Sequence, residues 1–143
     1  MISPSAIIYG SKLGHSRKVA EKIALRLCIP ELNNARQVVD LAKLANTGSR
    51  PLCLVASTWG DGELQDDMEA LLLRSGDMKG SKICLVELGN YYGYDDFEFG
   101  ALAIMEAMLQ ARGADVLTRL SLDSLPKIDW STLEAWSASF TVA

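Results

Sequence analysis

Cysteine is scarce in this sequence. The three cysteines, Cys28, Cys53 and Cys84, are odd in number, far apart and set among apolar neighbours. That arrangement argues against a disulfide framework and against a CxxC metal site. We therefore expect three buried, reduced thiols in a cytoplasmic protein.

Long apolar runs, an export signal and linkers are also lacking. No stretch approaches the roughly 20 apolar residues that a membrane span needs, and Met1–Ala6 holds no basic segment followed by an apolar one. Repeats, low-complexity tracts and Pro/Gly/Ser-rich linkers are absent as well. We expect a protein that is neither exported nor inserted in a membrane, and a single domain over residues 1–143.

Positive charge is in the minority, with 14 Lys and Arg against 18 Asp and Glu. The balance is uneven along the chain, because residues 1–50 carry +5 and residues 51–143 carry −9. An acidic majority argues against nucleic acid as a partner, since such binding depends on Lys and Arg at the phosphates. It leaves open a basic protein partner, or a small anion held by the N-terminal part.

Short apolar runs alternate with helical patterns. The predicted strands are 6–10, 35–40, 52–57, 82–88 and 115–122. Apolar positions at helical spacing predict helices over 16–27, around 68–72 and over 101–109, and a last one that starts with a capping box of Ser131 and Glu134. Residues 41–47 fit a short helix or a loop. The alternation predicts an α/β fold, a doubly wound parallel sheet with helices on both faces, which binds ligands at the carboxyl ends of its strands.

A glycine- and hydroxyl-rich segment, Tyr9–Ser16, follows the first predicted strand and leads directly into a helix. Backbone N–H groups at a helix N-terminus, with a favourable dipole, suit a phosphate. The alternative is an ordinary strand-to-helix turn capped by a serine. The segment is neither the GxGxxG dinucleotide pattern nor a Walker loop.

Two further loops combine aromatic and acidic residues. Trp59 stands among glycines and acids after the third strand, where core filling explains it less easily than it explains Trp136. We interpret its flat ring as a platform for a flat ligand. Residues 88–97, after the fourth strand, are again aromatic, turn-rich and acidic. Because all three loops end parallel strands, we expect them at one edge of the sheet.

These three segments, 9–16, 57–67 and 88–94, resemble the FMN-binding loops of flavodoxins. Chain length and an uninterrupted fifth strand resemble the short-chain group, whereas the Gly93-Tyr94 form of the third loop is more similar to that of long-chain members. The resemblance covers essentially the whole chain. It implies a flavodoxin-like sheet of five parallel strands in the order 2-1-3-4-5.

The resemblance also implies the site. The phosphate of FMN would lie in the loop 11–16, and its ring would be stacked between Trp59 and Tyr94, with Asn90 at the polar edge of the flavin. The implied cofactor-binding residues are Ser11, Lys12, Leu13, Gly14, His15, Ser16, Ser57, Thr58, Trp59, Gly60, Asp61, Gly89, Asn90, Tyr91, Tyr94 and Phe97. Leu13 departs from the family, which normally has threonine there. One lost hydrogen bond to a charged group costs about one to two decades of affinity, which Lys12 or His15 can offset by charge. We interpret His15, the only histidine, as an exposed residue of the phosphate loop without a catalytic role.

No catalytic triad, Cys/His pair or metal-ligand cluster is visible, so the cofactor would do the redox work. By resemblance, the peptide after Trp59 turns its carbonyl toward the flavin, which Gly60 permits because it lacks a Cβ, and this favours a neutral semiquinone. Acids around the ring would oppose the anionic hydroquinone and steer basic redox partners; they are Asp61, Glu63, Asp66, Asp67, Asp95, Asp96 and Glu98. Asp66, Asp67 and Glu69 also suit a helix start.

The leading hypothesis is a monomeric, low-potential one-electron carrier without a substrate of its own. An FMN-dependent reductase of the quinone reductase type, or the flavin module of a larger reductase, is the alternative. A receiver-type signalling domain fits poorly, since Gly10 and Ser57 stand where that class has its acids. A degenerate fold that has lost FMN rests on Leu13 alone.

Overall fold

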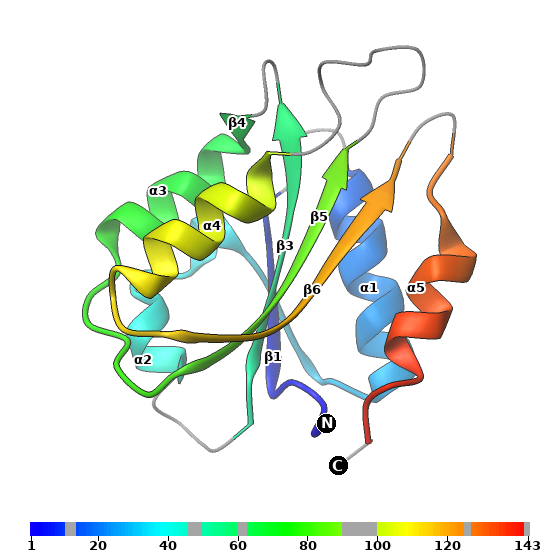
Figure 1. Cartoon of the computed structure of the whole chain (residues 1–143), viewed down its shortest axis with the longest axis horizontal. Helices are drawn as coiled ribbons and strands as arrows, with labels where there is room; N and C mark the ends of the chain where they lie inside the picture. Colours follow the sequence, from blue (N-terminus) through cyan, green and yellow to red (C-terminus); the bar gives the residue numbers. More distant parts are fainter. Residues whose placement is uncertain (11–13, 46–49, 60–62, 90–99, 125–126, 142–143) are drawn as a thin grey trace.

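The structure is a computed structural model that describes residues 1–10, 14–45, 50–59, 63–89, 100–124 and 127–141. Its centre is a parallel sheet with helices on both sides (Figure 1). The strands are β1 (Ala6–Gly10), β2 (Glu31–Asn34), β3 (Leu52–Trp59), β4 (Glu63–Leu64), β5 (Lys82–Gly89) and β6 (Asp115–Asp123). The helices are α1 (His15–Leu27), α2 (Leu41–Ala45), α3 (Asp66–Arg74), α4 (Ala101–Gln110) and α5 (Trp130–Ser137), with a 3-10 turn η1 (Ala35–Gln37).

The strand order is β2-β1-β3-β5-β6, and all these neighbours are parallel. The five long strands thus lie in the predicted order 2-1-3-4-5, and the predicted fold class is confirmed. The one addition is β4, which pairs antiparallel with the end of β3, Trp59 opposite Glu63. Every parallel strand therefore points its carboxyl end to the same edge of the sheet, the upper edge in Figure 1.

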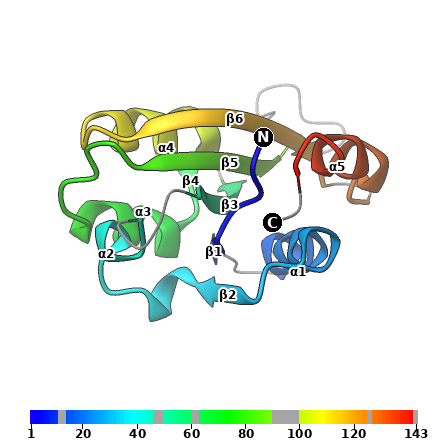
Figure 2. The same cartoon turned by 90° about the horizontal axis from the view of Figure 1, so that it is seen from below.

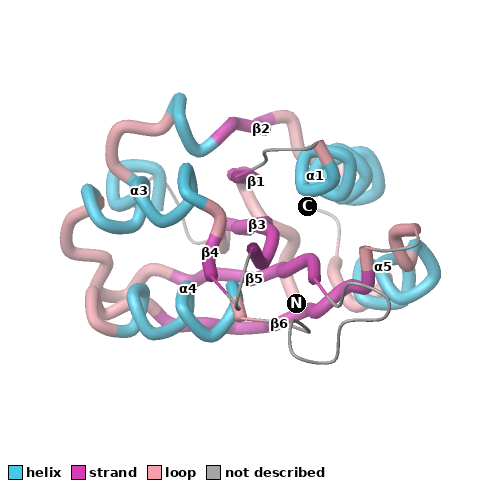
Figure 3. Tube along the Cα trace, turned by 90° about the horizontal axis from the view of Figure 1, so that it is seen from above, coloured by secondary structure: helices cyan, strands magenta, loops and turns pink. Residues whose placement is uncertain are grey.

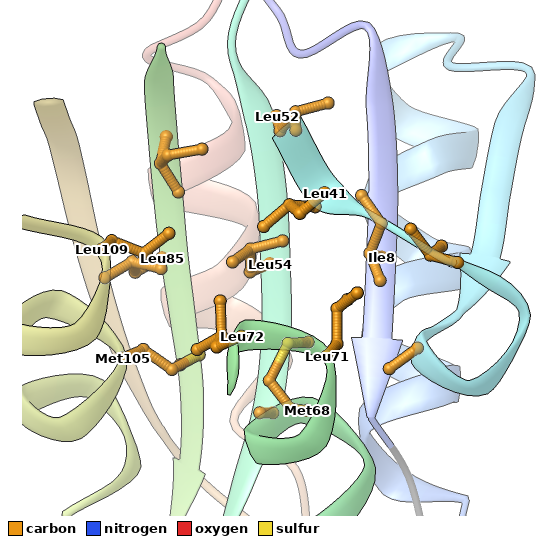
Figure 4. Packing of buried hydrophobic residues seen from close by; sticks show 14 of the residues in the cluster. Ile8, Leu41, Leu52, Leu54, Met68, Leu71, Leu72, Leu85, Met105 and Leu109 are labelled. Carbon is orange, nitrogen blue, oxygen red and sulfur yellow. The ribbon is translucent and has the colours of Figure 1, made fainter. Parts of the chain in front are cut away.

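Alternating strand residues divide the core between the two faces. Ile8, Leu54 and Leu85 face α2, α3 and α4, where they meet Met68 and Met105 (Figure 4). Their sequence neighbours, including Val55 and Val86, pack with residues of α1 and α5. These two helices lie together on the other side of the sheet (Figure 2). Strands covered on both faces are expected to be apolar throughout, which is why the middle strands could be recognised from the sequence.

The second strand was predicted wrongly at 35–40; it is β2, four residues earlier. Three of the four residues of β2 are polar, and it is an edge strand with only β1 beside it, so its side chains remain partly exposed. The backbone carbonyls of Ala35, Val38 and Val39 accept hydrogen bonds from the Arg74 guanidinium of α3, at 2.6 to 3.2 Å. The Arg74 side chain, distant in sequence, thus donates to backbone carbonyls that would otherwise accept hydrogen bonds from a neighbouring strand.

The start of α5 and one thiol also differ from prediction. Asp129 caps α5, accepting from the Thr132 N–H and from two hydroxyls, so Ser131 is not the capping residue. These bonds, chiefly those from Thr132, hold the pKa of Asp129 below its usual value. Cys28, the left-handed C-cap residue of α1, is exposed, against expectation. Cys53 and Cys84 are buried as predicted, and burial raises the pKa of Cys84 to about 12.

Candidate functional site

The candidate site is the carboxyl edge of the sheet, where β1, β3 and β5 end between α1 on one side and α3 and α4 on the other (Figure 3). Six of the predicted cofactor-binding residues are described there in full: Gly14, His15, Ser16, Ser57, Thr58 and Gly89. Trp59 is placed by its backbone, at the end of β3. The other predicted residues lie outside the described residues; they are Ser11, Lys12, Leu13, Gly60, Asp61, Asn90, Tyr91, Tyr94 and Phe97.

Among the described residues, no side chain caps the N-terminus of α1. Gly14 is the N-cap residue, in the left-handed region with φ of 89°, so no serine occupies the N-cap position itself, whereas Ser11 lies outside the described residues. The first intrahelical bond runs from the Lys18 N–H to the Gly14 carbonyl at 3.0 Å. The N–H groups of His15, Ser16 and Arg17 therefore have no acceptor within the helix and none among the described residues, so the positive dipole end of α1 suits an anion.

The start of α3 shows what a closed helix N-terminus looks like in the same sheet edge. The Gln65 side chain accepts from the Met68 N–H at 3.0 Å, and the first turn holds Asp66, Asp67 and Glu69. The first turn of α1 contains no acid and is followed by Lys18. Of these two helix starts, only that of α1 is suited by charge and by open donors to a phosphate.

A buried pair of hydroxyls joins the first and second predicted loops. The Oγ atoms of Ser16 and Ser57 lie 2.6 Å apart, one at the start of α1 and the other near the end of β3. A bond between two hydroxyls uses one of their two protons, so the second can be donated elsewhere. Within the described residues neither hydroxyl has another partner. The pair thus offers a buried donor next to the open end of α1, which fits the phosphate end of FMN.

Thr58 faces the opposite side of the sheet from Ser57. Its Oγ1 accepts from the backbone N–H groups of Gly100 and Ala101, at 3.2 and 3.1 Å, so its oxygen holds the start of α4. Glu87, a residue that the sequence prediction missed, accepts from the Leu102 N–H at 3.0 Å. A lone acid within the apolar run of β5 was the signal that could have identified it.

Gly89 and His15 are the remaining predicted residues that the structure describes. The Gly89 carbonyl accepts from both the N–H and the hydroxyl of Ser124, which fixes the start of the third loop. His15 begins α1 and is half-buried rather than fully exposed.

The acidic side of the site is partly described. Glu63 and Asp66 are exposed at the start of β4 and α3, whereas Asp67 is half-buried and pairs with Arg36 at 2.9 Å. The acids of α3 stand in its first turn, as expected for a helix start, and their role beside the flavin stays a prediction. The remaining acids of the predicted rim, Asp61, Asp95, Asp96 and Glu98, lie outside the described residues.

Comparison with known proteins identifies the family. The family model described as flavodoxin matches residues 7–136. A flavodoxin from Maridesulfovibrio salexigens is 33% identical over 90% of this chain and 91% of its own, and flavodoxin 1 of Azotobacter vinelandii is 31% identical over 85% and 73%. Oxidised flavodoxin 1 of Bacillus cereus, a solved structure, superposes with a TM-score of 0.72 at 25% identity over 94% of this chain and 95% of that one. The chain belongs to the flavodoxin family and is an FMN-containing electron carrier that works with redox partner proteins.

Proposed function

We propose that this flavodoxin holds FMN at the carboxyl edge of its sheet, with the phosphate at the start of α1, and that residues 1–143 form a single FMN-binding domain. The observation that carries the proposal is the N-terminus of α1, which no described side chain caps, beside the Ser16–Ser57 hydroxyl pair. An anion there would meet the N–H groups of His15, Ser16 and Arg17, which have no acceptor among the described residues, together with a hydroxyl proton and a helix dipole, and the first turn of α1 holds no acid.

The two faces of β3 divide the work in this proposal. Ser57 faces α1 and serves the phosphate, whereas Thr58 faces α4, so its contact with FMN would come from its backbone. Trp59 would stack on the ring, opposite Tyr94, and Asn90 would meet its polar edge. Bound FMN supplies the one-electron chemistry, and the chain orients it and sets its surroundings.

The partner surface would be the acidic rim beside the ring. Glu63 and Asp66 are exposed there, and the C-terminal part of the chain carries the net negative charge. We propose that basic redox proteins dock on this rim in brief, salt-sensitive encounters, and that the protein is a cytoplasmic monomer that binds no nucleic acid. Within the described residues, no helix is long and apolar enough to span a membrane.

Anaerobic titration of the FMN-loaded protein with a calibrated reductant tests the electron-carrier role. The expected result is two separate one-electron steps, with the second at much lower potential. A single two-electron step, or rapid reduction by NADPH without a partner protein, would favour the alternative of an FMN-dependent reductase.

Substitution of Trp59 tests the ring assignment. Trp59→Ala should weaken FMN binding by about tenfold or more, since a ring stack is worth about 1–3 kcal/mol. The matched control is Trp136→Phe on α5, whose indole N–H bonds to Thr118 on the α1 and α5 side of the sheet. Equal FMN affinity in the two variants would contradict the stacking role.

A further inference from the structure

Glu87 is a buried carboxylate in an otherwise apolar strand. It is 4% exposed, and its sequence neighbours in β5 are buried apolar residues. Its Oε1 accepts from the Leu102 N–H at 3.0 Å, and its Oε2 accepts from the Ser121 hydroxyl at 2.6 Å. A buried carboxylate is costly unless its oxygens are hydrogen-bonded, and both oxygens of Glu87 are.

A β-bulge in β6 brings the second of these partners to Glu87. Ile83 pairs with Val116 but Cys84 pairs with Thr118, so one residue of β6 is skipped. The skip reverses which residues of β6 face α4, and Ser121 then lies opposite Glu87 on that face.

The start of α4 depends on side chains from the sheet. Its N-cap, Gly100, provides no side chain, and the first turn holds no acid. Three consecutive N–H groups, of Gly100, Ala101 and Leu102, are taken instead by Thr58 of β3 and Glu87 of β5. Two strands that border the candidate site therefore cap one helix together.

The capped end is where the chain returns from the third predicted loop. The chain leaves the sheet at Gly89, two residues after Glu87, and Ser124 holds that departure point. It returns at Gly100, which Thr58 and Glu87 hold through the first turn of α4. Both ends of the excursion between β5 and α4 are thus fixed to the strands beneath the site.

We propose that Glu87 is a positioning residue of the flavin site. Its carboxylate caps α4 and fixes the return of the chain beside β3 and β5, so that the affinity for FMN depends on a residue that does not touch FMN. The inference rests on the proposed function, in that FMN is taken to lie at this edge of the sheet.

The test compares Glu87→Ala with Glu87→Gln by FMN titration and, in the protein without FMN, by amide hydrogen exchange. Glu87→Ala leaves the Leu102 N–H without its acceptor and should weaken FMN binding by about tenfold. Exchange at Gly100, Ala101 and Leu102 should accelerate in that variant. Glu87→Gln keeps an oxygen for Leu102 and can donate to Ser121, so its affinity should return to within about threefold of the unsubstituted protein.

Glu106→Gln is the matched control, because Glu106 also joins α4 to β6, through Arg119, but away from the start of the helix. It should leave FMN affinity and the exchange of the first α4 amides unchanged. If Glu87→Ala does not fold, Ser121→Ala removes only the bond to Oε2 and should weaken FMN binding by about threefold.

Equal FMN affinity in Glu87→Ala and the unsubstituted protein would overturn the inference, as would a Glu87→Gln variant as weak as Glu87→Ala. Where Ser121→Ala replaces Glu87→Ala in the test, unchanged FMN affinity in Ser121→Ala would also overturn the inference. Failure of the unsubstituted protein to bind FMN would instead refute the proposed function, and amide exchange would still report whether Glu87 holds α4.

Discussion

Charge reversal at the start of α1 should affect FMN binding and folding stability differently. Arg17 lies in the first turn of α1, and its exposed guanidinium pairs with Glu21 at 3.3 Å. Arg17→Glu removes that weak pair and puts two acids four residues apart, but it adds an acid at the positive end of the helix. These effects are each a few tenths of a kcal/mol and opposed, so stability without FMN should change by less than about 0.5 kcal/mol.

The effect on FMN is larger because the substitution changes the charge by two units near a phosphate. A phosphate carries about two negative charges, and two unit charges about 8 Å apart in water interact by about 0.5 kcal/mol. The four unit interactions sum to about 2 kcal/mol, and screening at 0.1 M salt reduces this to about 1 kcal/mol, or roughly a fivefold loss of affinity. At 1 M salt the loss should fall below about twofold.

Lys79→Glu is the control, since it makes the same charge change on an exposed residue before β5, at the other end of the sheet. Fluorescence titration with FMN at 0.1 M and 1 M salt measures both variants. Equal FMN affinities of Arg17→Glu and Lys79→Glu at 0.1 M salt would refute the placement of the phosphate at α1. A loss of FMN affinity in Arg17→Glu that persists at 1 M salt would refute it as well.

Three further outcomes follow from the described contacts. A Cβ at Gly10 would lie 2.2 Å from the Oε1 of Gln65, the cap of α3. Gly10→Ala should therefore lower the free energy of unfolding of the protein without FMN, measured in urea, by about 1–3 kcal/mol. Gly76→Ala is the control, because its Cβ would have no contact nearer than 3.8 Å, and it should change that free energy by less than about 0.5 kcal/mol. Thiol titration should find Cys28 reactive in the native protein and the two buried thiols reactive only after denaturation; three reactive thiols in the native state would contradict their burial. Asp129→Ala should destabilise the protein at pH 7, and the deficit should shrink as the pH falls below 3.8, because the folded pKa of Asp129 is lowered and its contribution is lost on protonation; a deficit independent of pH would contradict the capping role.

The fold could be predicted where local pattern and tertiary environment agree. β1 was predicted to the residue, and α1 begins one residue earlier than predicted, because their apolar positions repeat with the period of a strand and of a helix. β2 could not be located in this way, since all of its residues but Leu32 are polar and the segment after it is held by Arg74. The contact between Arg74 and Ala35, 39 residues apart, is not indicated by the local pattern of apolar and polar residues.

The edge of the sheet at which the described site residues lie could be predicted from the sequence, but the hydrogen bonds between them could not. The loops around Ser16 and Ser57 could be assigned to one edge from the order of the strands, and the hydroxyl pair confirms that these two loops meet. The capping of α4 by Thr58 and Glu87 depends on strand register and on the bulge in β6, which no sequence period indicates. The roles assigned to Trp59 and to the residues outside the described ranges stay predictions.

The most direct test of the central claim, that the phosphate of FMN binds at the N-terminus of α1, is an amide NMR titration with FMN and with riboflavin, which lacks the phosphate. FMN should shift the amides of His15, Ser16 and Arg17 as well as those of Ser57 and Gly89. Riboflavin should shift the amides at the ends of β3 and β5 but leave the first turn of α1 almost unchanged. Equal shifts in that turn with both ligands, or none with either, would contradict the claim.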